Sequence, residues 1–228
     1  MPATLAIIAA LPREIAALVK GVRPDKRLRV GGVCLYRLPT AVIVAAGMGR
    51  ERATLAVEAA LAEGGVTELI SVGLAGSCAA TLKPGSVVEA DPVIDTLTGE
   101  RYETGWERGV SYVLATADGI ASVREKARLG AAYNAALVDM EAAAVARLAA
   151  AHGLRFRAIK AISDAHDFEL ASLSRFAGEH GSFRTAAFAM HTALRPAQWA
   201  KTMTLGRDSA RALRALNDRL SAIVRSEA

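Results

Sequence analysis

The amino-acid sequence predicts an α/β protein, a single domain of three layers in which helices flank a mixed, largely parallel central sheet. Two observations carry this prediction. Apolar runs of strand length alternate along the chain with segments of helical periodicity, which is the pattern of a sheet covered by helices. Of the 228 residues, 52% are hydrophobic and 22% charged, and no repeat or linker divides the chain, so we expect one globular domain over 1–228.

The first half of the chain is expected to contain five strands and two helices. Apolar runs indicate the strands, at 5–10, 33–38, 41–46, 69–72 and 86–90. Helical spacing predicts a helix that begins at 13–19 and a longer amphipathic one at 50–63. Gly73 and Gly76 follow the fourth strand, and they favour a tight turn or a close approach of the backbone to a ligand.

The second half is expected to add two strands and three helices. Apolar runs indicate strands at 111–116 and 156–162, and the second of them breaks at Ser163 and Asp164. Helical periodicity indicates helices at 138–151, 175–193 and 209–225. The last helix carries an apolar stripe among arginines, so we expect the stripe to dock on the domain, with contact to anionic lipid as the alternative.

Composition and charge argue against several classes of function. The net charge of +5 comes from arginines interleaved with acidic residues, not from a basic block, which does not favour nucleic-acid binding. The two cysteines and four histidines show no disulfide or metal-ligand spacing, so we expect neither a metal nor an organic cofactor. The N-terminal apolar run is too short for a signal peptide, and no run approaches the about 18 residues of a membrane span, so we expect a cytoplasmic location.

Acidic residues beside apolar strands are the candidates for function, because ligands of open α/β sheets bind beyond the carboxyl ends of strands. Glu14 follows the first strand, where it either complements a helix N-terminus or activates water as a general base. Asp164 ends the last strand, as a helix cap or as a catalytic acid. Asp139 and Glu141 lie two residues apart and point in different directions on a helix, so one can cap while the other binds a ligand such as a ribose diol.

Five segments, in order along the chain, together resemble the purine nucleoside phosphorylase/uridine phosphorylase superfamily. They are IIAALPREI around Glu14, Gly47-Met48-Gly49 before the long helix, Gly73-Leu74-Ala75-Gly76, Val138-Asp139-Met140-Glu141-Ala142 and Lys160-Ala161-Ile162-Ser163-Asp164. The branch that they resemble most is that of the 5′-methylthioadenosine/S-adenosylhomocysteine nucleosidases. The tail after Ala165 is more similar to the branch associated with hopanoid biosynthesis, which acts on an adenosylated lipid.

The resemblance implies a phosphorylase/hydrolase-like fold and an enzyme that cleaves the N-glycosidic bond of a purine nucleoside, with adenine as the expected base. It implies that Asp164 protonates the departing purine at N7 and that Glu14 activates the attacking water. The substrate-binding residues that it implies are Glu141 on the ribose hydroxyls, Met140 against the sugar, the backbone of Ile120 and Ala121 at the base, and Ala75, Gly76 and Ser163. A protonated leaving base and an oxocarbenium-like sugar fit this acidic set, and no cofactor is required.

The sequence also departs from the family pattern, which leaves the reaction open. Leu74 replaces a hydroxyl residue, and Ile120 replaces an aromatic residue that would stack on the base. Hydrolysis is favoured because the carboxylate of Glu14 would repel phosphate, although Arg50 and Arg52 could supply a phosphate site. Two alternatives remain. One is a purine nucleoside phosphorylase, which is a glycosyltransferase with inorganic phosphate as co-substrate, and which could be of the type that acts on adenosylhopane. The other is a non-catalytic nucleoside-binding protein.

The expected partners are a small-molecule nucleoside and further copies of the same chain. Members of the superfamily that the sequence resembles are oligomers, and the alanine-rich helices could pack against another subunit, so we expect a homodimer. We expect no nucleic acid, and contact of the C-terminal helix with a membrane is the lesser alternative. The 5′ substituent of the nucleoside does not follow from the sequence.

Overall fold

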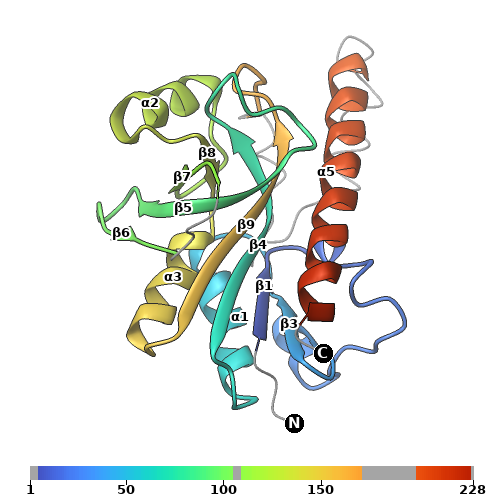
Figure 1. Cartoon of the computed structure of the whole chain (residues 1–228). Coiled ribbons are helices and arrows are strands. Elements are labelled where there is room, and N and C mark those ends of the chain that lie inside the picture. Colours follow the sequence, from blue (N-terminus) through green and yellow to red (C-terminus); the bar gives the residue numbers. More distant parts are fainter. Residues whose placement is uncertain (1–4, 105–108, 171–198, 227–228) are drawn as a thin grey trace.

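The computed structural model describes residues 5–104, 109–170 and 199–226, and the helix expected at 175–193 lies outside these ranges. One mixed sheet forms the centre of the described part, and helices cover both of its faces (Figure 1). Helices α1 (Arg50–Leu61) and α3 (Ala142–Ala151) pack together on one face, while α5 (Trp199–Ser226) lies along the other. The predicted three-layer α/β fold is confirmed.

The sheet has the order β2-β3-β1-β4-β8-β7-β5-β6, and β9 pairs with both β4 and β5. Five of its pairings are parallel and four antiparallel among the described strands. Because β9 joins β5 back to β4, the strands β4, β8, β7, β5 and β9 close into a ring, from which β1, β3 and β2 extend. The strands are β1 (Leu5–Ala9), β2 (Cys34–Arg37), β3 (Ala41–Ala45), β4 (Glu68–Ser77), β5 (Val87–Asp95), β6 (Arg101–Tyr102), β7 (Tyr112–Thr116), β8 (Leu137–Asp139) and β9 (Arg155–Asp164).

Alternate residues of each strand supply separate apolar cores on the two faces of the sheet. In β1, Ala6 and Ile8 pack with α1 and α3, whereas Leu5 and Ile7 pack with α5. A third core around Leu129 holds helix α2 (Val123–Tyr133) against β7 and β8. Two 3-10 turns, η1 (Pro12–Glu14) and η2 (Leu28–Gly31), lie in the connection from β1 to β2.

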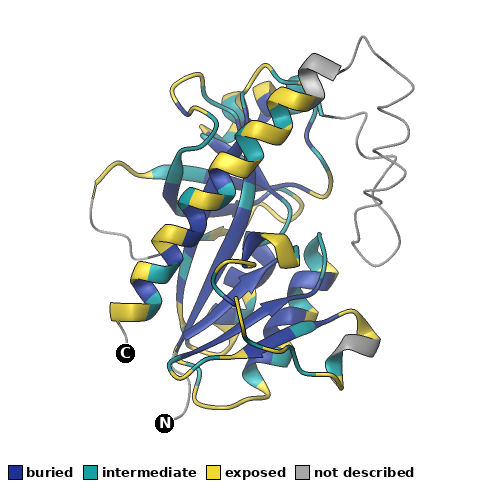
Figure 2. Cartoon of the chain, turned by 90° about the vertical axis from the view of Figure 1, so that its right-hand side faces the viewer, coloured by how far each residue is buried: buried dark blue, intermediate teal, exposed yellow. Residues whose placement is uncertain are grey.

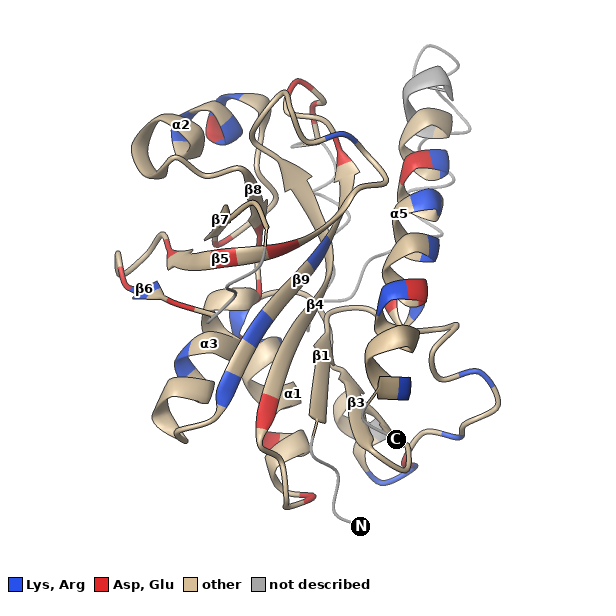
Figure 3. Cartoon of the chain, viewed as in Figure 1, with Lys and Arg blue, Asp and Glu red and all other residues tan. Residues whose placement is uncertain are grey.

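The C-terminal helix docks by its apolar stripe, as the sequence predicted. Ala212, Leu216 and Leu220 are fully buried on the sheet, while the charged residues of α5 lie on its outer side (Figures 2 and 3). The side-chain amide of Asn217 donates a hydrogen bond of 2.9 Å to the main-chain carbonyl of Glu14, which ties this helix to η1. No helix among the described residues is long and apolar enough to cross a membrane.

Two predicted elements near the first and fourth strands were wrong. The helix expected at 13–19 is only the 3-10 turn η1, in which the Glu14 side chain turns back onto the main-chain N–H groups before it. The glycine segment 73–76 does not turn but continues β4, because β9 pairs with this strand along nearly its whole length.

The segment before α3 also differs from its prediction, and one helix had no sequence-based counterpart. Helix α3 begins at Ala142, not at Val138, because 137–139 form the short strand β8 between β4 and β7. The helix without a counterpart is α2, which begins after Ser122, whose hydroxyl accepts the Glu125 N–H at 3.1 Å as an N-cap.

Candidate active site

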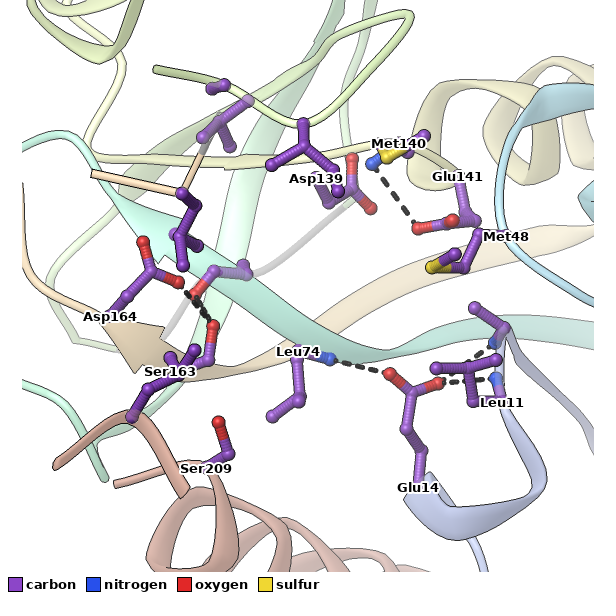
Figure 4. A pocket seen from close by; sticks show the side chains of 18 of the residues that line it. Leu11, Glu14, Met48, Leu74, Asp139, Met140, Glu141, Ser163, Asp164 and Ser209 are labelled. Atoms are coloured by element: carbon purple, nitrogen blue, oxygen red, sulfur yellow. Dashed lines mark hydrogen bonds between the residues drawn. The ribbon is translucent and has the colours of Figure 1, made fainter. Parts of the chain in front are cut away.

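A pocket of about 430 Å³ opens where β1, β4, β8 and β9 end, and α5 forms one of its walls (Figure 4). This volume lies in the range of pockets that bind small molecules. The structure brings together all nine residues that the sequence predicts to be catalytic or substrate-binding, since each of them lines the pocket: Glu14, Ala75, Gly76, Ile120, Ala121, Met140, Glu141, Ser163 and Asp164.

Glu14 is held in place by main-chain donors from two parts of the chain. One carboxylate oxygen accepts the N–H groups of Ala10 at 3.0 Å and Leu11 at 2.9 Å, and the other accepts the N–H of Leu74 at 3.1 Å. Burial raises the pKa of this carboxyl, and these hydrogen bonds oppose the rise. A Cβ atom at Gly73 would lie 3.0 Å from the Glu14 carboxylate, so this glycine leaves room for the acid.

Asp164 ends β9 on the opposite side of the pocket. Its Oδ1 accepts a hydrogen bond of 2.5 Å from the Ser163 hydroxyl, and its Oδ2 forms a buried ion pair with Lys126 of α2. Burial raises the pKa of Asp164, while the Lys126 ammonium and the Ser163 hydroxyl act in the opposite direction. A Cβ atom at Gly76 would lie 3.0 Å from Oδ2 of Asp164, so the second glycine of β4 leaves room for the second acid.

Asp139 and Glu141 take the two different roles that their spacing allows. Asp139 caps α3 by accepting the Ala142 N–H at 2.9 Å, and it forms a buried ion pair of 2.8 Å with Lys160. Glu141 lies on the pocket wall (Figure 4), and one of its carboxylate oxygens accepts the Gly49 N–H at 2.7 Å. Burial, and after it the charge of Asp139, raises the pKa of Glu141 to about 7.

The remaining walls of the pocket are mostly apolar. Ile120 and Ala121, which precede α2, line the pocket, and so does Met140, which precedes Glu141. None of the described lining residues is aromatic, so this described part of the pocket contains no ring on which a base could stack. The described residues contain no group of three or more His, Cys, Asp or Glu side chains that could hold a metal ion.

Two parts of the pocket were missed by the sequence analysis. One is Lys126, which lines the pocket from α2, a helix that the sequence did not predict. The sign that could have located it is its position three residues before Leu129, on the apolar face of a helix, where a lysine is buried. The other part is the wall from α5, a helix that the sequence predicts to dock on the domain, with contact to anionic lipid as the alternative. It consists of Leu205, Gly206, Ser209, Ala210 and Leu213.

Comparisons with known proteins agree with this architecture. Residues 4–122 and 108–194 match the family model described as "Phosphorylase superfamily". No curated protein matches the sequence. The fold is similar to that of the 5′-methylthioadenosine/S-adenosylhomocysteine nucleosidase of Helicobacter pylori, in a variant with 5′-methylthioadenosine in the active site, at 16% identity and a TM-score of 0.68 over 97% of this chain and 100% of that one.

Two further solved structures share the fold. The futalosine hydrolase of Helicobacter pylori is 17% identical, with a TM-score of 0.66 over 96% of this chain and 99% of that one. An S-adenosylhomocysteine nucleosidase of Streptococcus pyogenes, solved with 5-methylthiotubericidin, is 19% identical, with a TM-score of 0.67 over 97% of this chain and 98% of that one.

Proposed function

Because the chain belongs to the phosphorylase superfamily, we propose that it is a nucleosidase that hydrolyses the N-glycosidic bond of a purine nucleoside or a 5′-substituted analogue. The observation that carries this proposal is the placement of Glu14, Glu141 and Asp164 around one pocket. The three carboxyl groups come from different elements, and each is held by its own hydrogen bonds.

In the proposed mechanism, Asp164 gives a proton to N7 of the purine while the bond between the base and the sugar breaks. The electron pair of that bond leaves with the base, and the sugar becomes an oxocarbenium-like cation. A buried acid suits this step, because the pKa of Asp164 is raised by burial and the group therefore holds its proton at a higher pH.

The other two carboxylates complete the reaction. Glu141 accepts hydrogen bonds from the ribose hydroxyls, and its charge favours the positive charge that develops on the sugar. Glu14 takes a proton from the water that attacks the sugar carbon, and its main-chain donors keep it oriented toward the pocket. The proton lost by Asp164 and the proton gained by Glu14 balance the hydrolysis.

Water is the favoured second substrate because the two candidate phosphate ligands are engaged elsewhere. Arg50 pairs with Asp95 at 2.5 Å, and Arg52 donates hydrogen bonds to the main-chain carbonyls of Ala46 and Gly31. Neither arginine lines the pocket. The pocket lining includes the exposed Arg13, but the buried group beside it is Glu14, a carboxylate that repels phosphate. Phosphorolysis is the second candidate reaction, and it is supported only by the membership of the chain in the phosphorylase superfamily.

Adenine is the proposed base, and the apolar wall from α5 favours an apolar 5′ substituent. Leu205 and Leu213 supply the large apolar side chains of that wall, and Leu74 of β4 also lines the pocket. Similar folds support an adenine nucleoside, since one of the neighbouring structures holds 5′-methylthioadenosine in its active site.

The direct test is release of free purine, measured by chromatography, from adenosine, 5′-methylthioadenosine, S-adenosylhomocysteine and inosine. We expect the purified chain to release the base from at least one of the adenine compounds, and the Asp164→Asn variant to lose this activity. Release that is unchanged in Asp164→Asn, or no release from any of the four compounds, would contradict the proposal.

A further inference from the structure

Lys126 is a buried cation that reaches the pocket from α2 and contacts the end of β9. Its side chain is 1% exposed, and its ammonium touches Oδ2 of Asp164. The same nitrogen donates hydrogen bonds to the main-chain carbonyls of Ala165 at 2.8 Å and Phe168 at 3.1 Å. An ammonium has three donors and no acceptor, so these three oxygens use its full hydrogen-bonding capacity. Lys126 therefore has no donor left for a ligand, and its effect on a ligand passes through Asp164.

The contact fixes the orientation of the Asp164 carboxyl group. Lys126 holds Oδ2, and Ser163 donates to Oδ1. Gly76 makes this arrangement possible, because a Cβ atom there would lie 3.0 Å from Oδ2 and 3.1 Å from Cε of the lysine. The carboxyl group is thus held between β4, α2 and its own strand, in the pocket that Ile120 and Ala121 also line.

Among the described residues, Lys126 is the cation that contacts Asp164, and none of the other titratable groups around this pair takes its place. Cys78 lies near the pair, but burial raises the pKa of its thiol to about 12, so it is neutral. On α2, Glu125 is engaged with Arg128 at 2.7 Å on the exposed side of the helix. After β9, His166 is half exposed and lies 4.0 Å from Asp167. The carboxylate of Glu169 accepts the Val123 N–H at the start of α2.

We propose that Lys126 is a positioning residue, which holds Asp164 in place and neutralises the carboxylate that remains when this acid gives its proton to the leaving base. The inference rests on the proposed function of the pocket. A buried carboxylate without a partner is costly, and the ammonium is already in contact when the charge appears. Lys126 thereby makes Asp164 a better proton donor and sets the pH above which it is ionised.

The test compares two neutral replacements with one that keeps the charge. Lys126→Met is close in length but has no charge, Lys126→Gln keeps donors for the two carbonyls without the charge, and Lys126→Arg keeps the cation. Arg128→Met is the matched control, because it removes a positive charge from an exposed position of the same helix. Circular dichroism reports whether each variant is folded. If Lys126→Met does not fold, Lys126→Gln is the neutral variant that is used in the test.

The first readout is the pH dependence of kcat/KM for base release. We expect both neutral variants to lose about tenfold or more at the pH optimum, since general acids contribute about 10²–10⁴-fold and these variants retain a weaker acid. We also expect the loss of activity at high pH to move upward by about one pH unit or more, because a neighbouring opposite charge commonly lowers the pKa of a carboxyl by that amount. Lys126→Arg should restore part of both effects, and Arg128→Met should match the wild type.

The second readout does not require turnover. Titration of the Asp164 carboxyl by carbon-13 NMR, assigned by its absence in Asp164→Asn, gives its midpoint in the empty protein. We expect a higher midpoint in the neutral variants than in the wild type. An unchanged midpoint in a folded neutral variant would overturn the role of Lys126, even if the wild type releases purine. A wild type that releases no purine while the midpoint moves would instead overturn only the proposed function.

Discussion

Replacing Glu141 with glutamine is expected to stabilise the protein and impair its activity. Burial and the charge of Asp139 raise the pKa of Glu141 from an ordinary 4.5 to about 7. The folded protein therefore binds the proton more tightly than the unfolded chain does, so the free energy of unfolding falls as the pH rises from 4.5 through about 7. Glutamine is neutral, has nearly the same shape, and can still accept the Gly49 N–H with its amide oxygen.

The magnitude follows from the difference between the two pKa values. This difference corresponds to about 3 kcal/mol of stability that is lost once Glu141 is fully ionised. The figure is an upper bound, because water in the pocket screens part of the charge. We therefore expect Glu141→Gln to exceed the wild type in stability by up to about 3 kcal/mol at pH 8 and by almost nothing near pH 4.5. The loss of a charged hydrogen-bond acceptor for the ribose should lower kcat/KM by about 10- to 100-fold at pH 8.

Urea denaturation at pH 5 and pH 8 measures this difference, with the exposed α1 residue Glu58 replaced by glutamine as the matched control. The stability of the control relative to the wild type should be the same at both pH values. If Glu141→Gln and the wild type show the same change in stability between pH 5 and pH 8, the raised pKa assigned to Glu141 is wrong.

Four further changes or measurements test other parts of the account. Asp164→Asn should reduce turnover by about 10²-fold or more with the fold intact, whereas Asp167→Asn, an exposed acid nearby, should not; equal activity of the two would remove Asp164 from the mechanism. Gly76→Ala should lower kcat by about tenfold or more, because its Cβ would displace the Asp164 carboxyl, and full activity would refute the close fit seen here. Lys160→Met should destabilise the protein by about 3–5 kcal/mol in urea denaturation, because it leaves a buried carboxylate without its partner, and a near-zero effect would contradict that ion pair. Sedimentation at micromolar concentration should give the mass of a homodimer, and a monomeric mass would exclude it.

The acidic residues of the site could be predicted because each lies next to an apolar run that the sequence makes visible. Glu14 follows the buried strand β1, in η1, and Asp164 ends the buried strand β9, and the apolar pattern of both strands is a local property of the sequence. The spacing of Asp139 and Glu141 likewise predicted two directions, which the structure shows as a helix cap and a pocket wall. Local patterns thus located the acids without locating their partners.

The partners could not be predicted because they depend on contacts between distant parts of the chain. Lys126 of α2 and Asp164 of β9 meet only in the folded sheet, where α2 packs on β7 and β8, and nothing in either segment alone indicates this contact. Gly73 and Gly76 were expected in a turn, since glycine is common there, but pairing with β9 keeps them in the strand beside the two acids. The same holds for the α5 wall, whose distance from Glu14 in the sequence hides its contact with the pocket.

Hydrolysis and phosphorolysis are distinguished by the rate of purine release at phosphate concentrations from zero to saturating, with identification of the sugar product. We predict a rate that does not depend on phosphate and a free sugar as product, because in the proposed mechanism Glu14 activates water, and Arg50 and Arg52 are engaged outside the pocket. A reaction that requires phosphate and yields the sugar 1-phosphate would contradict the assignment of this pocket to hydrolysis.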